Sequence, residues 1–104
     1  MDKRPYSYEF SPLSEYDLNE IFDYLVSELF SPQAAEQLIE NIQDAVERVC
    51  EFPFSRPLLT NTILRGKGYR LLVVQNFNIF YVVENQTVVI RRILHGSRNY
   101  ESML

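Results

Sequence analysis

Apolar and polar positions alternate with two different periods along this chain of 104 residues, and the periods separate helical from extended segments. Tyr6–Phe10 places aromatic and polar side chains at alternate positions, which predicts a strand with one buried face. Ser11-Pro12 should end that strand. Over Leu18–Leu29 apolar side chains instead recur at helical spacing, which predicts a helix that ends near residue 30.

The polar residues around the helical segments suggest where each helix begins. Ser14 is the expected N-cap of the first helix, with Asp17 three residues later at the capping-box offset. Ser31 and Pro32 should be the N-cap and first position of a second helix. The apolar stripe of that helix consists of Ala35, Leu38, Ile42, Ala45, Val46 and Val49. Since the connector is short, we expect an antiparallel helical hairpin.

The second half of the chain predicts consecutive strands joined by short turns. Two prolines exclude a helix from residues 51–57. Because the run Leu71–Val74 is apolar on both faces, its strand should be central in the sheet. The expected strands are Thr60–Arg65, Tyr69–Gln75, Phe77–Glu84 and Thr87–Leu94.

These elements give one α+β domain over residues 1–104, with the order β-α-α-β-β-β-β. We expect an antiparallel meander sheet packed against the N-terminal helical hairpin. The length is typical of a single domain.

Composition points to the cytoplasm and away from bound cofactors. No apolar run approaches a membrane span, and the first residues have no apolar core of a signal peptide. Cys50 is the single cysteine, so it is expected to be a packed core thiol with no disulfide or cysteine-based zinc site. Paired carboxylates are absent from the predicted strands, so no metal is expected.

Charge is distributed unequally between the two halves of the chain. Residues 1–51 carry twelve acidic and three basic side chains, a net charge of −9. Residues 52–104 carry two acidic and seven basic side chains, a net charge of +5. An acidic hairpin therefore packs on a basic sheet, and the local fields exceed what the overall charge of −4 suggests.

Basic residues near the predicted strands are the candidates for function. Arg91 and Arg92 are adjacent, so they should point to opposite faces, and a buried one would need a carboxylate partner. Arg70, His95 and Arg98 could complete a positive concavity for phosphate or carboxylate groups. Alternatively, Arg70 and Arg92 form salt bridges with the acidic helices. His95, the only histidine, is either a general base or a hydrogen-bonded strand end.

Several segments in this order resemble the RelE/ParE superfamily of toxins from bacterial type II toxin–antitoxin modules. Most informative is the Ile-Leu-His-Gly-x-Arg ending at residues 93–98. The similar segments are Asp17–Leu25, Ser31–Ala35, Leu64–Arg70, Asn78–Tyr81 and Val89–Arg98.

The resemblance implies one of two activities. RelE-like members cleave mRNA in the ribosomal A site with lysines, arginines and a late tyrosine or histidine, whereas ParE-like members inhibit DNA gyrase. Asn61 and Ile63 occupy the positions of the nuclease lysines here, and neither can stabilise a phosphate. As a nuclease the chain would have to use Arg70, His95 and Arg98.

We therefore expect a ParE-like toxin that binds gyrase without bond chemistry and is neutralised by a cognate antitoxin. The alternatives are a RelE-like, metal-independent mRNA endonuclease and a decayed toxin that retains only antitoxin binding. A homodimer or a toxin–antitoxin hetero-oligomer is possible. The expected partner-binding residues are Arg65, Lys67, Arg70, Arg91 and Arg98.

Overall fold

The computed structural model describes residues 5–104, and its elements follow the order β-α-α-α-β-β-β. Residues 1–4, which belong to the start where no signal peptide is expected, lie outside the described residues. The elements are β1 (Ser7–Phe10), α1 (Pro12–Ser27), α2 (Pro32–Val49), α3 (Thr62–Gly66), β2 (Arg70–Val74), β3 (Phe77–Glu84), β4 (Thr87–His95) and a final 3-10 turn, η1 (Tyr100–Ser102).

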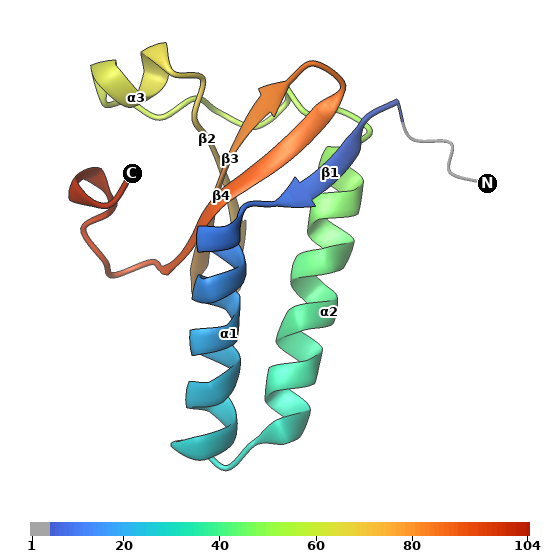
Figure 1. Ribbon diagram of the computed structural model, residues 1–104, viewed down its shortest axis with the longest axis vertical. Coiled ribbons are helices and arrows are strands. Elements are labelled where there is room, and N and C mark those ends of the chain that lie inside the picture. The colour runs from blue at the N-terminus through green and yellow to red at the C-terminus, as the bar shows by residue number, and fades with distance from the viewer. Residues whose placement is uncertain (1–4) are drawn as a thin grey trace.

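One four-stranded sheet packs against the hairpin of α1 and α2, which confirms the expected α+β class (Figure 1). The strand order is β1-β4-β3-β2. β2, β3 and β4 form the antiparallel meander, whereas β1 pairs in parallel with β4. That parallel pairing follows from the helical hairpin, which returns the chain to the same side before the meander begins.

The main core lies between the sheet and α2. All six apolar residues of the expected α2 stripe are buried, as predicted. All of them except Ala35 pack in one core with Ile79 and Tyr81 of β3 and Ile90 and Ile93 of β4. The Tyr81 ring is fully buried, and its hydroxyl donates a 2.7 Å hydrogen bond to the carbonyl of Pro53. The loop after α2 is thereby fastened to the centre of the sheet.

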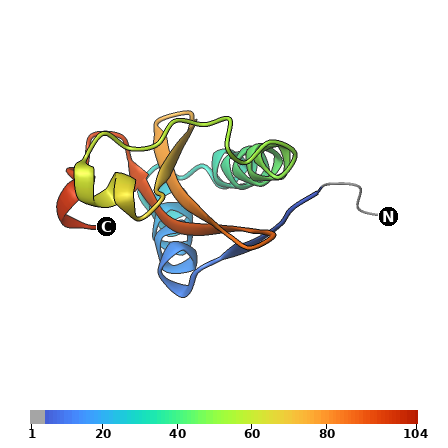
Figure 2. The ribbon, with the colours of Figure 1, turned by 90° about the horizontal axis from the view of Figure 1, so that it is seen from above.

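The other face of the sheet has a smaller core of its own. α3 and the C-terminal segment lie across the sheet from α2 (Figure 2). Phe80 and Leu94 of the sheet pack there against Leu64 of α3. Tyr100 lies over Phe80 with the ring centroids 4.9 Å apart. Both faces of the sheet are therefore partly covered by the chain itself.

Two expectations about the segment before and in β2 were wrong. Thr60–Arg65 does not form a strand, because Asn61 caps a short helix by accepting a 3.0 Å hydrogen bond from the N–H of Leu64. β2 lies at the edge of the sheet and not at its centre. It is apolar on both faces because the hairpin core covers one face and the smaller core covers part of the other.

The N-cap of α1 also differs from the expectation. The cap is Ser11, whose Oγ accepts a 3.1 Å hydrogen bond from the N–H of Ser14, and Pro12 takes the first helical position. Ser14 is fully buried within the first turn and donates its hydroxyl to the Ser11 carbonyl at 2.9 Å. The pattern Ser-Pro at residues 11–12 therefore begins a helix as well as ending a strand.

A β-bulge in β4 corrects the expected orientation of its arginines. The pairing with β3 shifts between Phe80 and Tyr81, so Tyr81 pairs with Ile90 whereas Phe80 pairs with Arg92. Ile90 and Ile93 both pack in the hairpin-facing core. The two residues between them, Arg91 and Arg92, therefore lie on the same face and not on opposite faces.

The helical hairpin extends well beyond the sheet at the end away from α3 (Figure 1). At this tip Tyr24, Leu29 and Phe30 expose 55%, 54% and 85% of their surfaces. Within residues 5–104 the apolar side chains at this end of the hairpin are therefore only partly covered. Over residues 5–104, none of the helices has the length and apolar character needed to cross a membrane.

Candidate functional site

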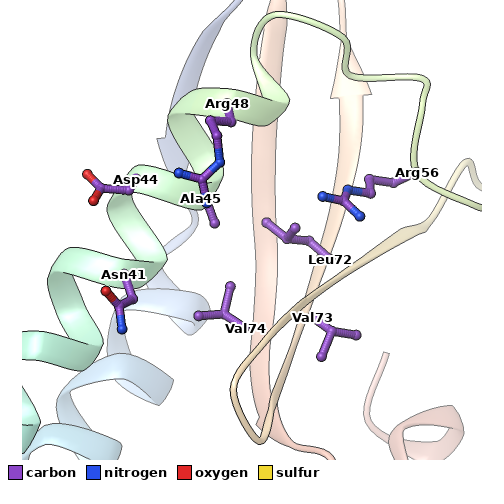
Figure 3. Close-up of a pocket in the computed structure, with 8 residues that line it drawn as sticks. All are labelled: Asn41, Asp44, Ala45, Arg48, Arg56, Leu72, Val73 and Val74. Atoms are coloured by element: carbon purple, nitrogen blue, oxygen red, sulfur yellow. The ribbon is translucent and has the colours of Figure 1, made fainter.

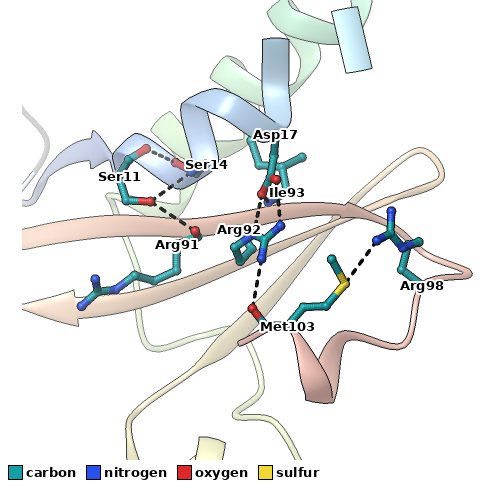
Figure 4. A network of polar contacts seen from close by, with 8 residues as sticks. All are labelled: Ser11, Ser14, Asp17, Arg91, Arg92, Ile93, Arg98 and Met103. Atoms are coloured by element: carbon teal, nitrogen blue, oxygen red, sulfur yellow. Dashed lines mark hydrogen bonds and ion pairs between the residues drawn. The ribbon is translucent and has the colours of Figure 1, made fainter. Parts of the chain in front are cut away.

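A buried ion pair joins α1 to β4 beside the last residues of the chain (Figure 4). Arg92 donates from Nε and Nη2 to the two carboxylate oxygens of Asp17, at 2.7 Å and 2.9 Å. Asp17 Oδ2 also accepts a 3.0 Å hydrogen bond from the N–H of Ile93. The third donor of Arg92, Nη1, binds the carbonyl of Met103 at 3.0 Å.

This pair has a structural role, because its charged atoms are already bound within the chain. The hydrogen bonds to Asp17 raise the pKa of the Arg92 guanidinium above its ordinary value, so the guanidinium stays charged. β1 ends beside Ile90, and beyond it Ser11 donates to the carbonyl of Arg91 at 3.1 Å. Ser11 and Asp17 thus bind the edge of β4 where β1 no longer pairs with it.

Arg70 is held by the loop that precedes α3. Its Nη1 donates to the carbonyls of Arg56 and Phe54 at 2.6 Å and 3.3 Å. The guanidinium also lies 5.2 Å from the centre of the Phe54 ring. No carboxylate of the acidic helices is paired with Arg70 among the described residues, so the alternative of a salt bridge holds for Arg92 but not for Arg70.

The other expected partner-binding residues lie on separate parts of the surface. Arg91 pairs with Glu84 at 2.8 Å, and both side chains are substantially exposed, at 41% and 54%. Arg65 and Lys67 are exposed at the C-terminal end of α3. Arg98 follows β4 and contacts the sulfur of Met103 at 3.5 Å.

His95 ends β4 in a small hydrogen-bonded turn. Its Nδ1 accepts from the N–H of Ser97 at 3.2 Å and lies 2.8 Å from the Ser97 hydroxyl. An Nδ1 that accepts a backbone N–H carries no proton, so these contacts assign the proton of the neutral ring to Nε2. The edge of the ring packs on Phe77, with the centroids 5.6 Å apart.

The alternative nuclease residues are not gathered into one site. Arg70 pairs with Tyr81, whereas His95 pairs with Phe77, so their levels on β3 differ by four residues. At about 3.3 Å per residue this separation is about 13 Å along the strand. Arg98 lines the same hollow as His95, and both residues are exposed. In residues 5–104 no group of three His, Cys, Asp or Glu side chains is placed to hold a metal ion.

A broad hollow lies where the hairpin extends past the sheet. This α1 groove has a volume of about 590 Å³ and is mainly apolar, with charged residues at its margin. A hollow of about 340 Å³ shares Glu20, His95 and Arg98 with it and reaches the ion pair of Asp17. The α1 groove is lined by Glu20, Ile21, Tyr24, Leu25, Leu29, Ala34, Leu38, Gln75, Asn76, Phe77, His95 and Arg98.

The sequence predicts several apolar residues of this groove only as members of a helical stripe. Ile21 and Leu25 belong to α1 and are only partly buried, whereas Leu29 lies just beyond its end and is half exposed. The stripe continues to the end of the hairpin, which the sheet does not reach. The sequence therefore indicates that the apolar stripe continues. It does not indicate how far the strands extend alongside it.

Comparison with known proteins agrees with the fold and the chain order described above. The family model for the ParE toxin of the type II toxin–antitoxin system parDE matches residues 8–100. The chain belongs to the ParE toxin family. It is therefore the toxin component of a type II toxin–antitoxin module, as the resemblance implied.

Solved structures with the fold of this ParE-family toxin include chains of two toxin–antitoxin systems. A chain of the chromosomal ParDE system from P. aeruginosa has a TM-score of 0.71 at 20% identity, with 89% of this chain and 98% of that chain covered. A chain of the RelBE2 toxin–antitoxin complex from Mycobacterium tuberculosis has a TM-score of 0.59 at 19% identity, with 88% and 98% covered. No curated protein matches the chain.

The positions expected for nuclease lysines hold a helix cap, Asn61, and an exposed apolar side chain, Ile63. Asn61 accepts from the backbone of α3 and donates to Glu101 at 3.0 Å. Ile63 is 69% exposed on α3. Neither side chain lies in the α1 groove with His95 and Arg98.

Proposed function

We propose that this ParE-family toxin arrests growth by binding DNA gyrase, without forming or breaking a covalent bond. The dispersal of Arg70 and His95 along β3 is the observation that carries this proposal. A phosphoryl-transfer site needs a base and a charge-stabilising group around one reacting phosphate. The guanidinium of Arg70 binds loop carbonyls instead, about 13 Å along the strand from the level of His95.

We also propose that an antitoxin neutralises the toxin by covering the α1 groove. Ile21, Leu25 and Leu29 offer a partner segment apolar surface that the chain leaves uncovered. His95 and Arg98 at the margin would orient acidic residues of that segment. Arg65 and Lys67, which are exposed on α3, are proposed contacts for a longer partner that reaches the other face of the sheet.

Two assays with purified components test the mode of action. DNA supercoiling by gyrase should be lost when the toxin is added, while mRNA on programmed ribosomes stays intact. The matched variant is His95→Ala, which should retain the inhibition because the imidazole has no catalytic role in this proposal. Cleavage of ribosome-bound mRNA with normal supercoiling would replace the proposal with the nuclease alternative.

Expression without antitoxin separates an active toxin from one that only binds antitoxin. Induction of the toxin alone should stop growth, and co-expression of the protein from the neighbouring reading frame should restore it. Normal growth on induction, with the folded protein present in the cells, would favour the decayed toxin.

A further inference from the structure

The connection between α1 and α2 exposes an aromatic side chain at the tip of the helical hairpin (Figure 1). Phe30 is 85% exposed, the highest value among the large apolar side chains of residues 5–104. Tyr24 and Leu29, which belong to the same tip, are each just over half exposed. A cluster of exposed apolar side chains typically marks a place of contact with another molecule.

The backbone at Phe30 has a conformation that suits glycine better than phenylalanine. Its φ is +49°, in the left-handed region that side chains with a Cβ seldom adopt. The N–H of Ser31 then donates to the Leu25 carbonyl at 3.0 Å, and the chain turns back toward α2. Glycine is the usual residue at such a helix end. Phe30 therefore adds backbone strain, and little of its surface is buried in return.

Acidic side chains form a margin around this apolar tip. Asp23 lies in the last turn of α1, Glu28 is its C-cap and Glu36 lies in the second turn of α2. All three side chains are exposed, and within residues 5–104 none of them forms an ion pair. The last turn of α1 has no basic residue, although the helix dipole favours one there.

The one basic residue of the hairpin lies at its other end. Between residues 12 and 49 the sequence has no lysine, arginine or histidine except Arg48. Arg48 is in the last turn of α2, about 24 Å along the helix from Pro32 at about 1.5 Å per residue. There it lies beside the sheet with Arg56 of the following loop (Figure 3). A partner complementary to the tip therefore has an apolar depression with a positively charged margin.

We propose that the hairpin tip enters such a depression on DNA gyrase, with Phe30 as the central anchor. The inference rests on the proposed function and names the toxin surface that contacts the target. An enzyme that handles DNA has basic surfaces because it must neutralise phosphates, so an acidic margin suits this target. A large aromatic side chain surrounded by groups that exclude water is typical of the residues that dominate binding energy.

The position of the tip also connects target binding with neutralisation. Tyr24 and Leu29 line the α1 groove as well as belonging to the tip, whereas Phe30 does not line the groove. A partner seated in the α1 groove would cover one side of the tip. It would thus obstruct gyrase without needing Phe30 for its own binding.

Binding of fluorescently labelled toxin to purified gyrase, measured by anisotropy, tests the anchor. Phe30→Ala should weaken binding about tenfold or more, and should raise the concentration for half-inhibition of supercoiling by the same factor. The matched control is Phe52→Ala, which removes the same side chain from a position that is 70% exposed after α2. It should leave both values unchanged. Equal effects of the two substitutions, or none at residue 30, would overturn the proposal.

Phe30→Gly separates lost binding from lost folding. Glycine accepts the left-handed backbone without strain, so the midpoint of thermal unfolding should not fall. Binding to gyrase should nevertheless fall as far as in Phe30→Ala. A glycine variant that binds as tightly as the unchanged chain would reject the aromatic anchor.

Paired charge variants test the acidic margin. Glu28→Gln combined with Glu36→Gln should weaken binding to gyrase and reduce its loss between about 50 mM and about 200 mM KCl. The control pair, Glu9→Gln with Glu15→Gln, removes the same charge from exposed positions outside the tip and should bind like the unchanged chain. Equal losses in both pairs would reduce the effect to overall charge and reject the margin.

The same variants distinguish other occupants of the tip and the failure of the proposed function. If Phe30→Ala inhibits gyrase normally but escapes neutralisation by the neighbouring protein, the tip belongs to the antitoxin contact. If Phe30→Ala inhibits normally but loses self-association in sedimentation, the tip belongs to a contact between copies of this chain. Either result overturns the proposal and leaves gyrase as the target. If the unchanged chain neither binds nor inhibits gyrase, the proposed function fails, and this inference fails with it.

Discussion

Single residues hold the layers of this toxin together at a few places. Asp17 is the clearest, because one carboxylate binds a guanidinium and a strand N–H while the same guanidinium holds a C-terminal carbonyl. Both side chains of the pair are largely removed from water, at 7% and 13% exposure. Removing one partner of such a pair leaves the other charge buried without compensation.

Asp17→Asn should therefore destabilise the fold by about 3 kcal/mol. The amide keeps the size of the side chain but not the charge that Arg92 requires. The free energy of unfolding from urea titration measures the change. Glu15→Gln, an exposed substitution in the same turn of α1, should cost less than about 1 kcal/mol. Equal costs would mean that the ion pair adds nothing to stability.

Tyr81 predicts a loss of stability in alkaline solution. Burial raises the pKa of its hydroxyl from 10.0 to about 12, so the folded state favours the neutral phenol. That contribution is complete below pH 10 and is lost as the pH rises from about 10 to 12. At 1.36 kcal/mol per pKa unit, the loss approaches about 3 kcal/mol.

Tyr81→Phe separates this titration from that of the other tyrosines. The variant loses the hydrogen bond to Pro53, about 1 kcal/mol at pH 7. Its stability should then fall less than that of the unchanged chain between pH 9 and 11, as measured by thermal unfolding. Parallel curves for the two proteins would contradict the assignment to Tyr81.

At the scale of elements, the start of α1 is decided by the Ser-Pro pair that follows β1. Ser11 accepts from the N–H of Ser14 and donates to the Arg91 carbonyl, so it caps the helix and binds β4. Ser14 is buried, but the acceptor of its hydroxyl, the Ser11 carbonyl, also receives the N–H of Glu15 at 3.0 Å.

The two serines should therefore respond differently to substitution. Ser11→Ala should cost about 1 to 2 kcal/mol of unfolding free energy, in the range of a lost N-cap. Ser14→Ala should cost less than half of that, since no acceptor is left unpaired. Urea titration of both variants measures the difference, and a larger cost at Ser14 would restore it as the cap.

The elements that the sequence predicted well are those defined by long periodic patterns. The stripe of α2 and the strands β3 and β4 were correct because many residues contribute to each pattern. α3 was missed because one cap, Asn61, decides a helix of five residues. The bulge beside Arg91 and Arg92 could not be predicted from the two-residue periodicity expected of a strand.

Less of the candidate site could be predicted than of the fold. His95 and Arg98 line the same groove, because His95 ends β4 and Arg98 follows it by three residues. Arg70 could not be placed relative to them without the register of β2 on β3. The α1 groove depends on how far the hairpin outreaches the sheet, which local sequence does not encode.

At the scale of the whole molecule, stability should be distributed unevenly along the long axis. At the centre of the sheet both faces are covered by packed side chains, whereas the tip of the hairpin extends past the strands. Segments with few buried contacts open locally at low free-energy cost.

Native-state hydrogen exchange should reveal this gradient. Amides of Ile79–Val82 and Val88–Ile90 should exchange slowest, and those of residues 22–38 near the tip should exchange much faster. Mass spectrometry of peptides from the labelled toxin measures both rates. Uniform protection along α1 and α2 would contradict the expected gradient.

The protruding hairpin also gives the molecule electrical polarity. Near its tip the end of α1 carries Asp23, Glu28 follows that helix and Glu36 lies in the first turns of α2, while the far end of the molecule carries Arg65 and Lys67 at α3. Near a polyanion such as DNA, opposite forces on the two ends exert a torque within a range of about 8 Å at physiological salt. The toxin would turn α3 toward the nucleic acid and hold the exposed aromatic tip outward, where protein surfaces can meet it.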